Sequence, residues 1–277
     1  MDVLFRNVLV LVRGGGDLAS GVAYRLAAAG FPVIITELPA PLLIRRKACY
    51  GTAVFEGHVT VDGLTAQRVQ SPAEALATLG EGRLPVLADA SGGALATHLY
   101  GDPAVLVDGR MAKTNLGTTK DDAPLVVGLG PGFTASLDCH AVVETNRGHN
   151  LGRVIWNGSP EPDTKTPGLI GTQRARRVLR APADGHVEGH AEIGDLLEEG
   201  QLVASVNGHD IRAPFRGALR GLIHPSVAVT TGLKVGDVDP RANPDYCDTI
   251  SDKALAVSGG VLEAVLASQA IRERLFR

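Results

Sequence analysis

The sequence predicts an α/β protein, in which a Rossmann-like parallel sheet domain is followed by a small biotinyl/lipoyl-like β domain and a C-terminal helix. Three observations indicate this fold class. A glycine loop joins an apolar strand to a helix near the N-terminus, apolar strand candidates recur up to about residue 155, and a repeated glycine pattern follows them. We expect the three segments to span residues 1–175, 176–241 and 242–277.

The N-terminal segment reads as one βαβ unit. Residues 8–12 form a continuous apolar, β-branched run, which is typical of a parallel strand covered on both faces. Residues 21–29 carry apolar side chains at helical spacing, and a second strand is expected over 32–37. Further elements are expected as a helix capped by Ser71 and Glu74 and ending at Leu79, and as strands over 85–89, 104–107, 125–127 and 141–144.

The second half contains an internal repeat. The pattern Ala-Pro-x-x-Gly-x-x-x-Gly begins at Ala181 and again at Ala213, an offset of 32 residues (213 − 181). The copies meet at a hairpin signal, Asn207-Gly208, which predicts a small pseudo-symmetric barrel or sandwich. This hairpin has no lysine, so we expect no swinging biotin or lipoyl arm.

The repeat is flanked by two further segments. Residues 157–173 have the composition of a linker or ordered surface loop. Residues 252–276 show a mostly helical pattern that Gly259-Gly260 interrupts, and this segment is expected to pack on the first domain or on a second subunit.

Composition excludes several classes of partner. The formal net charge is −3 and the pI is near 6.2, which provides no basic field for nucleic acid or anionic lipid. The apolar N-terminal run is too short to span a bilayer, so we expect neither a membrane span nor an export signal. The three cysteines are far apart, which favours the reducing cytoplasm, and the histidines show no metal-ligand spacing.

The first glycine loop is the strongest binding candidate. Its pattern Gly14-x-Gly16-x-x-Ala19 lies between a strand and a helix, where backbone N–H groups and the helix dipole favour an anion. Glu37 ends the second strand, where an acid accepts ribose hydroxyls in dinucleotide sites. The candidate ligand-binding residues here are Gly14, Gly15, Gly16, Asp17, Ser20, Gly21 and Glu37.

The alternative for this loop is a tight turn beside an exposed Glu37. Asp17 would repel a phosphate unless it points away or meets a cation, and helix capping is an equally good reading of it. Ser20 would either donate to a phosphate or cap the helix.

A second glycine loop, residues 128–133, also follows a strand, and it contributes Gly130 and Gly132 as binding candidates. Arg110, Lys113 and Asn115 follow another strand and could bind an anion; the alternative is a solvated loop.

The run Asp138-Cys139-His140 is the catalytic candidate, because a nearby cation would make Cys139 a nucleophile or soft ligand. A buried structural cysteine is the alternative, since adjacent side chains on an extended chain point apart.

Several motifs together resemble a known family. They are Arg13–Gly21, Tyr50–Gly57, Gly128–Phe133, Asp138–His140, Glu144–Arg153 and Lys234–Arg241. These motifs are similar to those of the selenium-dependent molybdenum hydroxylase accessory family of the YqeB type, and they extend over nearly the whole chain. The first domain also resembles the Rossmann domain of xanthine dehydrogenase accessory proteins of the XdhC type.

The resemblance implies a maturation protein that binds molybdenum cofactor, as molybdopterin or its nucleotide form, and aids its sulfuration, selenation or insertion into a client hydroxylase. The position of Cys139 between Asp138 and His140 adds the hypothesis that this thiol relays selenium or sulfur. Whether the protein catalyses a reaction or assembles as a homo-oligomer stays open. Two other functions stay open: an NAD(P)-dependent oxidoreductase, and a non-enzymatic assembly scaffold.

Overall fold

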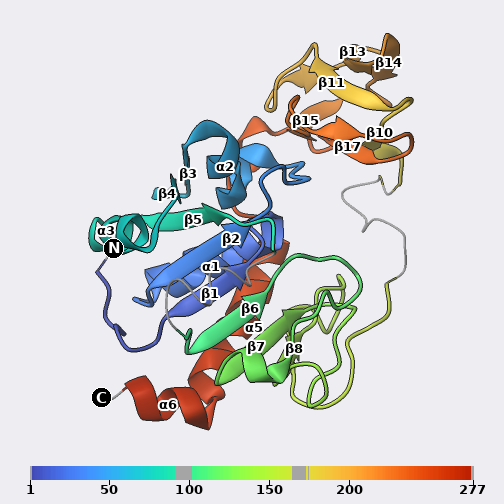
Figure 1. The fold of residues 1–277 in the computed structure, drawn as a ribbon. Coiled ribbons are helices and arrows are strands. Elements are labelled where there is room, and N and C mark those ends of the chain that lie inside the picture. Colours follow the sequence, from blue (N-terminus) through green and yellow to red (C-terminus); the bar gives the residue numbers. More distant parts are fainter. Residues whose placement is uncertain (1, 92–101, 164–172, 174, 276–277) are drawn as a thin grey trace. The chain divides into compact units, whose positions relative to one another are not determined.

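The structure, a computed structural model, describes residues 2–91, 102–163, 173 and 175–275, which form two compact units (Figure 1). Unit 1 consists of Met1–Pro39, Tyr50–Asp163 and Ile250–Arg277, and unit 2 of Ala40–Cys49 and Thr164–Thr249. Neither unit is a single continuous stretch of chain. The linker expected over 157–173 lies partly outside the described residues.

Unit 1 is built on one large mixed sheet. Its described strands lie in the order β3-β4-β5-β2-β1-β6-β7-β8-β9 and are parallel from β4 to β8, while β3 and β9 run antiparallel at the edges. The strands are β1 (Val10–Arg13), β2 (Val33–Glu37), β3 (His58–Val61), β4 (Leu64–Val69), β5 (Leu84–Ala88), β6 (Val105–Asp108), β7 (Leu125–Leu129), β8 (Ala141–Val143) and β9 (Val154–Ile155).

The expected α/β elements of the first half are confirmed to within a few residues. The largest shift is at the first helix, because α1 spans Asp17–Ala28 and therefore begins directly after the glycine loop. Helix α3 (Pro72–Gly80) begins as expected, with the Ser71 side chain accepting a hydrogen bond from the Glu74 N–H. The hairpin β3–β4 was not anticipated, although its turn carries the signal Asp62-Gly63.

Two apolar layers enclose the sheet. Alternate strand residues point to opposite faces, so Val10 and Val12 join one buried cluster and Leu11 joins another. The larger cluster includes α1 and the C-terminal helix α5 (Asp252–Ala267), which lie against each other on the same side of the sheet (Figure 1). The C-terminal helix therefore belongs to the core of unit 1.

Helix α5 is continuous through Gly259-Gly260, so the interruption expected from these glycines is wrong. Helix α6 (Gln269–Leu275) follows it. Within the described ranges, no single helix has the length and apolar composition to cross a membrane. Helices α5 and α6 meet both criteria only when they are taken together, and this pair is bent by 77°.

The short helical segments of unit 1 lie between strands. They are η2 (Tyr50–Thr52) and α2 (Ala53–Glu56) after β2, and η3 (Lys120–Asp122) before β7.

Unit 2 expresses the internal repeat as two related sheets. Their strand orders among the described residues are β10-β17-β15-β12 and β14-β13-β11-β16. The two orders correspond position by position: β10 with β14, β17 with β13, β15 with β11 and β12 with β16, so each pair differs by four in strand number. The strands are β10 (Val178–Arg180), β11 (Gly185–Gly189), β12 (Leu196–Leu197), β13 (Leu202–Val206), β14 (His209–Arg212), β15 (Gly217–Leu222), β16 (Ala228–Val229) and β17 (Lys234–Asp239). The remaining helical segments here are η1 (Arg46–Ala48), η4 (Ala175–Arg177) and η5 (Pro244–Tyr246).

Residues 40–49 leave unit 1 after β2 and pack within unit 2. The Arg45 guanidinium donates to the backbone oxygens of Tyr246 and Thr249, each at 2.9 Å, and Lys47 donates to the Ile193 oxygen at 2.6 Å. These side-chain contacts to backbone oxygens explain why a segment so early in the sequence belongs to the second unit.

Candidate functional site

The central feature of unit 1 is the position at β1 where the strand order reverses. Strands β2 to β5 lie on one side of β1, and strands β6 to β9 lie on the other side. Strand β1 lies between β2 and β6, and all three are parallel, so their carboxyl ends meet at one edge. Open α/β sheets bind ligands at such a switch point. We call this the carboxyl edge; it comprises the ends of β1, β2, β6, β7 and β8 and the loops that follow them.

The first glycine loop is closely packed at this edge. The Gly14 N–H donates to the Thr36 oxygen at 2.8 Å, and the Gly15 N–H donates to Glu37 Oε2 at 2.7 Å. A methyl group on Gly15 would lie 2.6 Å from the Gly51 Cα, because η2 covers the loop. Glu37, expected to accept a ribose hydroxyl of a ligand, instead accepts from the Gly15 N–H, so this amide is not available to a ligand.

The first turn of α1 follows directly on this loop. Gly16 is its N-cap residue and, being glycine, provides no side-chain hydrogen bond to the helix. Burial raises the pKa of Glu37, while the hydrogen bonds from the N–H groups of Gly15 and Leu38 act in the opposite direction. Asp17 occupies the first turn, where a negative charge complements the helix dipole.

Ser20 and Gly21 serve packing. The Ser20 hydroxyl is buried, donates to the Gly15 oxygen at 3.1 Å and accepts from the Tyr50 N–H at 2.8 Å, so it ties the loop to η2. A methyl group on Gly21 would lie 2.8 Å from the Ala254 Cβ, so this glycine lets α1 and α5 approach each other.

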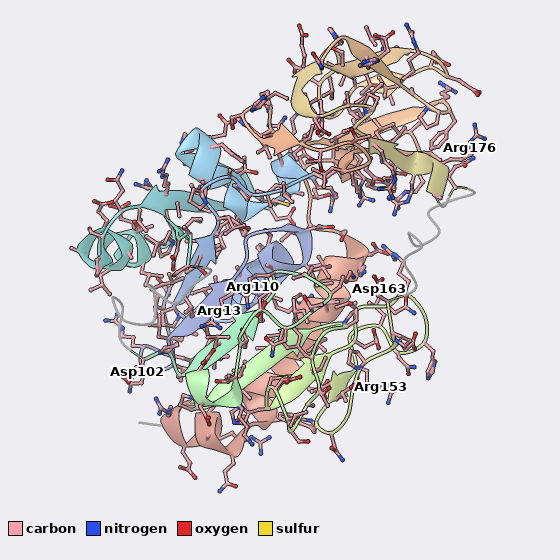
Figure 2. All side chains as sticks on the ribbon, turned by 45° about the vertical axis from the view of Figure 1, so that its right-hand side comes forward. Arg13, Asp102, Arg110, Arg153, Asp163 and Arg176 are labelled. Atoms are coloured by element: carbon pink, nitrogen blue, oxygen red, sulfur yellow. The ribbon has the colours of Figure 1, made fainter. Side chains whose placement is uncertain are left out.

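A buried polar network connects β1 to β6. The Thr118 hydroxyl is 0% exposed; it accepts from Arg13 at 2.7 Å and from Arg110 at 3.0 Å, and it donates to Asp108 at 2.7 Å. Arg110 also contacts both carboxylate oxygens of Asp108, and Arg13 pairs with Asp122 at 2.8 Å. Arg13 and Arg110 lie close together beside β6 in Figure 2. Arg110 is therefore already paired with a carboxylate.

The second glycine loop supports the segment that follows β6. A methyl group on Gly132 would lie 2.8 Å from the Thr114 nitrogen, and one on Gly130 would lie 2.2 Å from the Thr145 hydroxyl. Lys113 has a positive φ of 67° and lies 3.9 Å from Asp163, whereas the Asn115 side chain bonds to the Thr118 backbone. Among the residues expected after β6, Lys113 is therefore the one with an exposed, weakly paired charge.

The run Asp138-Cys139-His140 lies elsewhere. It precedes β8, so it sits at the amino ends of the strands, opposite the carboxyl edge. Asp138 accepts from the Thr134 N–H and His140 from the Val126 N–H, so the three side chains do not converge. Burial and the Lys120 charge lower the pKa of His140.

The Cys139 thiol is 0% exposed in the smaller apolar cluster and donates to the Ala141 oxygen at 3.3 Å. Burial raises its pKa to about 11, which keeps the thiol protonated at neutral pH. This environment is that of a structural cysteine.

Lys253 is a site residue that the sequence did not reveal. It lies in the first turn of α5, half-buried, and the charges of Arg147, Lys113, Asp17 and Glu144 act on it. No spacing connects it to the glycine loops, but its position at the start of a helix, after Ser251 as N-cap, could have marked it.

The described part of the chain holds no group of three or more His, Cys, Asp or Glu side chains placed to bind a metal ion. The site is therefore described by its backbone amides, its cations and Glu37.

Comparison with known proteins finds one informative similarity. The chain is 47% identical over 258 residues to the uncharacterized protein YqeB of Escherichia coli strain K12; this covers 93% of the chain and 47% of that protein. The chain thus spans about half the length of the curated relative that it matches. No family model matches it.

Among solved structures, an aspartoacylase family protein from Mesorhizobium loti aligns at 12% identity, over 77% of this chain and 58% of that one, with a TM-score of 0.24. That TM-score is too low to relate the two folds.

Proposed function

We propose that this protein binds molybdenum cofactor through its phosphate at the carboxyl edge and delivers it to a client molybdenum hydroxylase. The observation that carries the proposal is the N-terminus of α1, whose N-cap residue Gly16 supplies no side-chain hydrogen bond, at the switch point between β2, β1 and β6. A helix N-terminus next to a topological switch point is an anion-binding arrangement that many α/β proteins use. In this proposal, unit 1 is a Rossmann-like domain and unit 2 a biotinyl/lipoyl-like one.

The shape of the loop favours a single phosphate over a dinucleotide. The amides of Gly14 and Gly15 are occupied by Thr36 and Glu37, so we place the anion at Gly16 and the start of α1. A pyrophosphate lying along the whole loop would have to displace Glu37, which in a dinucleotide site is the partner of the ribose. The phosphate of molybdopterin fits the smaller opening, so the nicotinamide-dependent alternative is the weaker one.

The choice of molybdenum cofactor over other phosphorylated ligands rests on the motif resemblance, which the similarity to YqeB supports in part. When bound, the cofactor supplies the redox chemistry that the client enzyme uses. The residues of this chain would bind its phosphate and hold it away from bulk water. Binding and delivery are the steps proposed, because the buried Cys139 lies at the opposite edge of the sheet.

The variant Gly16→Asp tests the site without a large loss of stability. Gly16 has φ −75° and ψ −172°, a conformation in which aspartate is a favourable N-cap. The new carboxylate would cap α1 and repel a phosphate from the same amides. Gly80→Asp is the matched control, since it adds the same charge at an exposed position where a Cβ meets nothing within 4 Å.

The assay mixes purified protein with isolated molybdenum cofactor and measures the bound pterin by the fluorescence of its oxidised form. We expect binding by the wild type and by Gly80→Asp and its loss in Gly16→Asp. Absence of pterin binding by the wild type, or hydride transfer from NADH to any substrate, would overturn the proposal. Capture of a client hydroxylase that is unchanged in Gly16→Asp would favour the scaffold alternative.

A further inference from the structure

The two long helices of unit 1 begin side by side. Gly21 of α1 lies against Ala254 of α5, and four residues later the Arg25 guanidinium donates to the Ser258 hydroxyl at 2.9 Å. Equal steps along both chains mean that the helices run parallel, so both N-termini lie at the carboxyl edge (Figure 1). The positive ends of two helix dipoles therefore meet there, which favours a negative charge between them.

The charges of two other cations, Arg147 and Lys113, act on Lys253 in the first turn of α5. Arg147 makes a bidentate pair with Asp252, at 2.8 and 2.9 Å, and Lys113 lies 3.9 Å from Asp163. Lys253 differs from both, because its side-chain ammonium group makes no hydrogen bond or ion pair with another described residue.

The acids that act on Lys253, Asp17 and Glu144, attract its charge without forming an ion pair with it. Glu144 is buried, and its two carboxylate oxygens accept from the N–H groups of Asn146 and Glu161, at 2.6 and 2.7 Å. Burial lowers the pKa of Lys253 most, followed by the repulsion from Arg147 and Lys113, while Asp17 and Glu144 oppose this with smaller effects. Among the described residues, the ammonium group therefore has no hydrogen-bonded or ion-paired carboxylate.

We propose that Lys253, flanked by Arg147 and Lys113, is the cationic partner of the ligand's phosphate group, which binds between the N-termini of α1 and α5. This subsite rests on the proposed function, because the proposed function already places the phosphate of a ligand at the carboxyl edge. A phosphate dianion provides a counter-ion, relieves the repulsion among the three cations and receives both helix dipoles. It also gives a specific role to a residue more than two hundred positions from the glycine loop.

The test uses inorganic pyrophosphate as a small probe: unlike the pyrophosphate of a dinucleotide, it can place one phosphate at the helix ends without extending along the glycine loop. Binding is measured by calorimetry at low salt on the full chain. Lys253→Met keeps the apolar stem and removes the charge, whereas Lys253→Arg keeps the charge. Lys120→Met is the matched control, because Lys120 is an exposed lysine of the same unit. Its charge acts on His140, which lies at the amino ends of the strands and so away from the proposed subsite.

We expect Lys253→Met to weaken pyrophosphate binding at least about tenfold, since a charged hydrogen bond is lost. Lys253→Arg should restore most of the affinity, and Lys120→Met should bind as the wild type does. Circular dichroism of each variant shows whether it is folded. The proposal is overturned if the wild type does not bind pyrophosphate or if Lys253→Met, folded, binds it with wild-type affinity.

The two proposals fail separately. If pyrophosphate binding depends on Lys253 but no pterin binds, the cofactor assignment is wrong and the phosphate subsite stands. If pterin binds and neither ligand responds to Lys253→Met, the subsite is wrong and the cofactor assignment stands.

Discussion

Two adjacent glycines of α5 should respond in opposite directions to the same substitution. A methyl group on Gly260 would lie 2.2 Å from the Gly152 oxygen and 2.8 Å from a Val143 methyl carbon, whereas one on Gly259 meets nothing within 4 Å. Ordinary contact begins near 3.4 Å, so Gly260→Ala requires the helix or the loop at Gly152 to move by more than an ångström.

The magnitudes follow from overpacking and helix propensity. Alanine is favoured over glycine in a helix interior by about 1 kcal/mol, so Gly259→Ala should stabilise the protein by roughly that amount. Overpacking costs about 1–3 kcal/mol, and the clash at Gly260 involves backbone, so we place Gly260→Ala at a net loss of about 2 kcal/mol. The variants should then differ by about 3 kcal/mol, or roughly 6–12 °C in Tm.

Urea unfolding followed by the fluorescence of Trp156 measures this difference. Trp156 is the single tryptophan of the chain and lies in unit 1, as does α5, so its signal reports on the relevant core. Equal stability of the two variants, or a stabilising Gly260→Ala, would refute the close approach of α5 to the loop at Gly152.

Three further predictions concern other parts of unit 1. Thr118→Val should destabilise it by about 1–3 kcal/mol, because Asp108 and Arg110 lose a buried partner, while Thr118→Ser should retain most of the stability in the same urea assay. Burial raises the folded-state pKa of Glu37 above its usual 4.5, so the stability that Glu37 contributes is largest below that pH and is lost as the pH rises through the raised value. Urea unfolding at about pH 4 and about pH 8 should therefore show a larger loss with pH in the wild type than in Glu37→Gln, and equal losses would contradict this. Cys139, with a pKa of about 11 and no exposure, should react slowly with iodoacetamide until the protein is unfolded, and mass spectrometry showing rapid labelling of Cys139 in the native protein would contradict its burial.

Local signals predicted the elements of unit 1 because they act over a few residues. The apolar run at 8–12, the capping box at Ser71 and Glu74, and the glycine turn before α1 each express a preference that neighbouring residues satisfy. The glycine loop and Glu37 were expected to bind one ligand, and the structure joins them directly by the hydrogen bond from the Gly15 N–H to that carboxylate. The 32-residue repeat likewise became two matching sheets.

Contacts between distant parts of the chain could not be predicted from these local signals. Nothing around residue 40 shows that Arg45 and Lys47 bond to backbone oxygens near residues 246 and 193, since such contacts depend on where the chain returns. The pair Gly259-Gly260 looked like a helix break because glycine has low helix propensity, yet tertiary packing overrides it: Gly260 lets α5 approach the loop at Gly152.

The sequence by itself determined that the chain is an α/β protein with a glycine loop between β1 and α1, an acid at the end of β2 and a duplicated β segment. Only the tertiary structure decided which residues share a site. It placed Cys139 at the amino ends of the strands and Lys253 at the carboxyl edge, where the charges of Arg147 and Lys113 act on it. The reason is physical: strand direction and helix packing determine which edge of the sheet a residue occupies, and both depend on contacts between segments far apart in the chain.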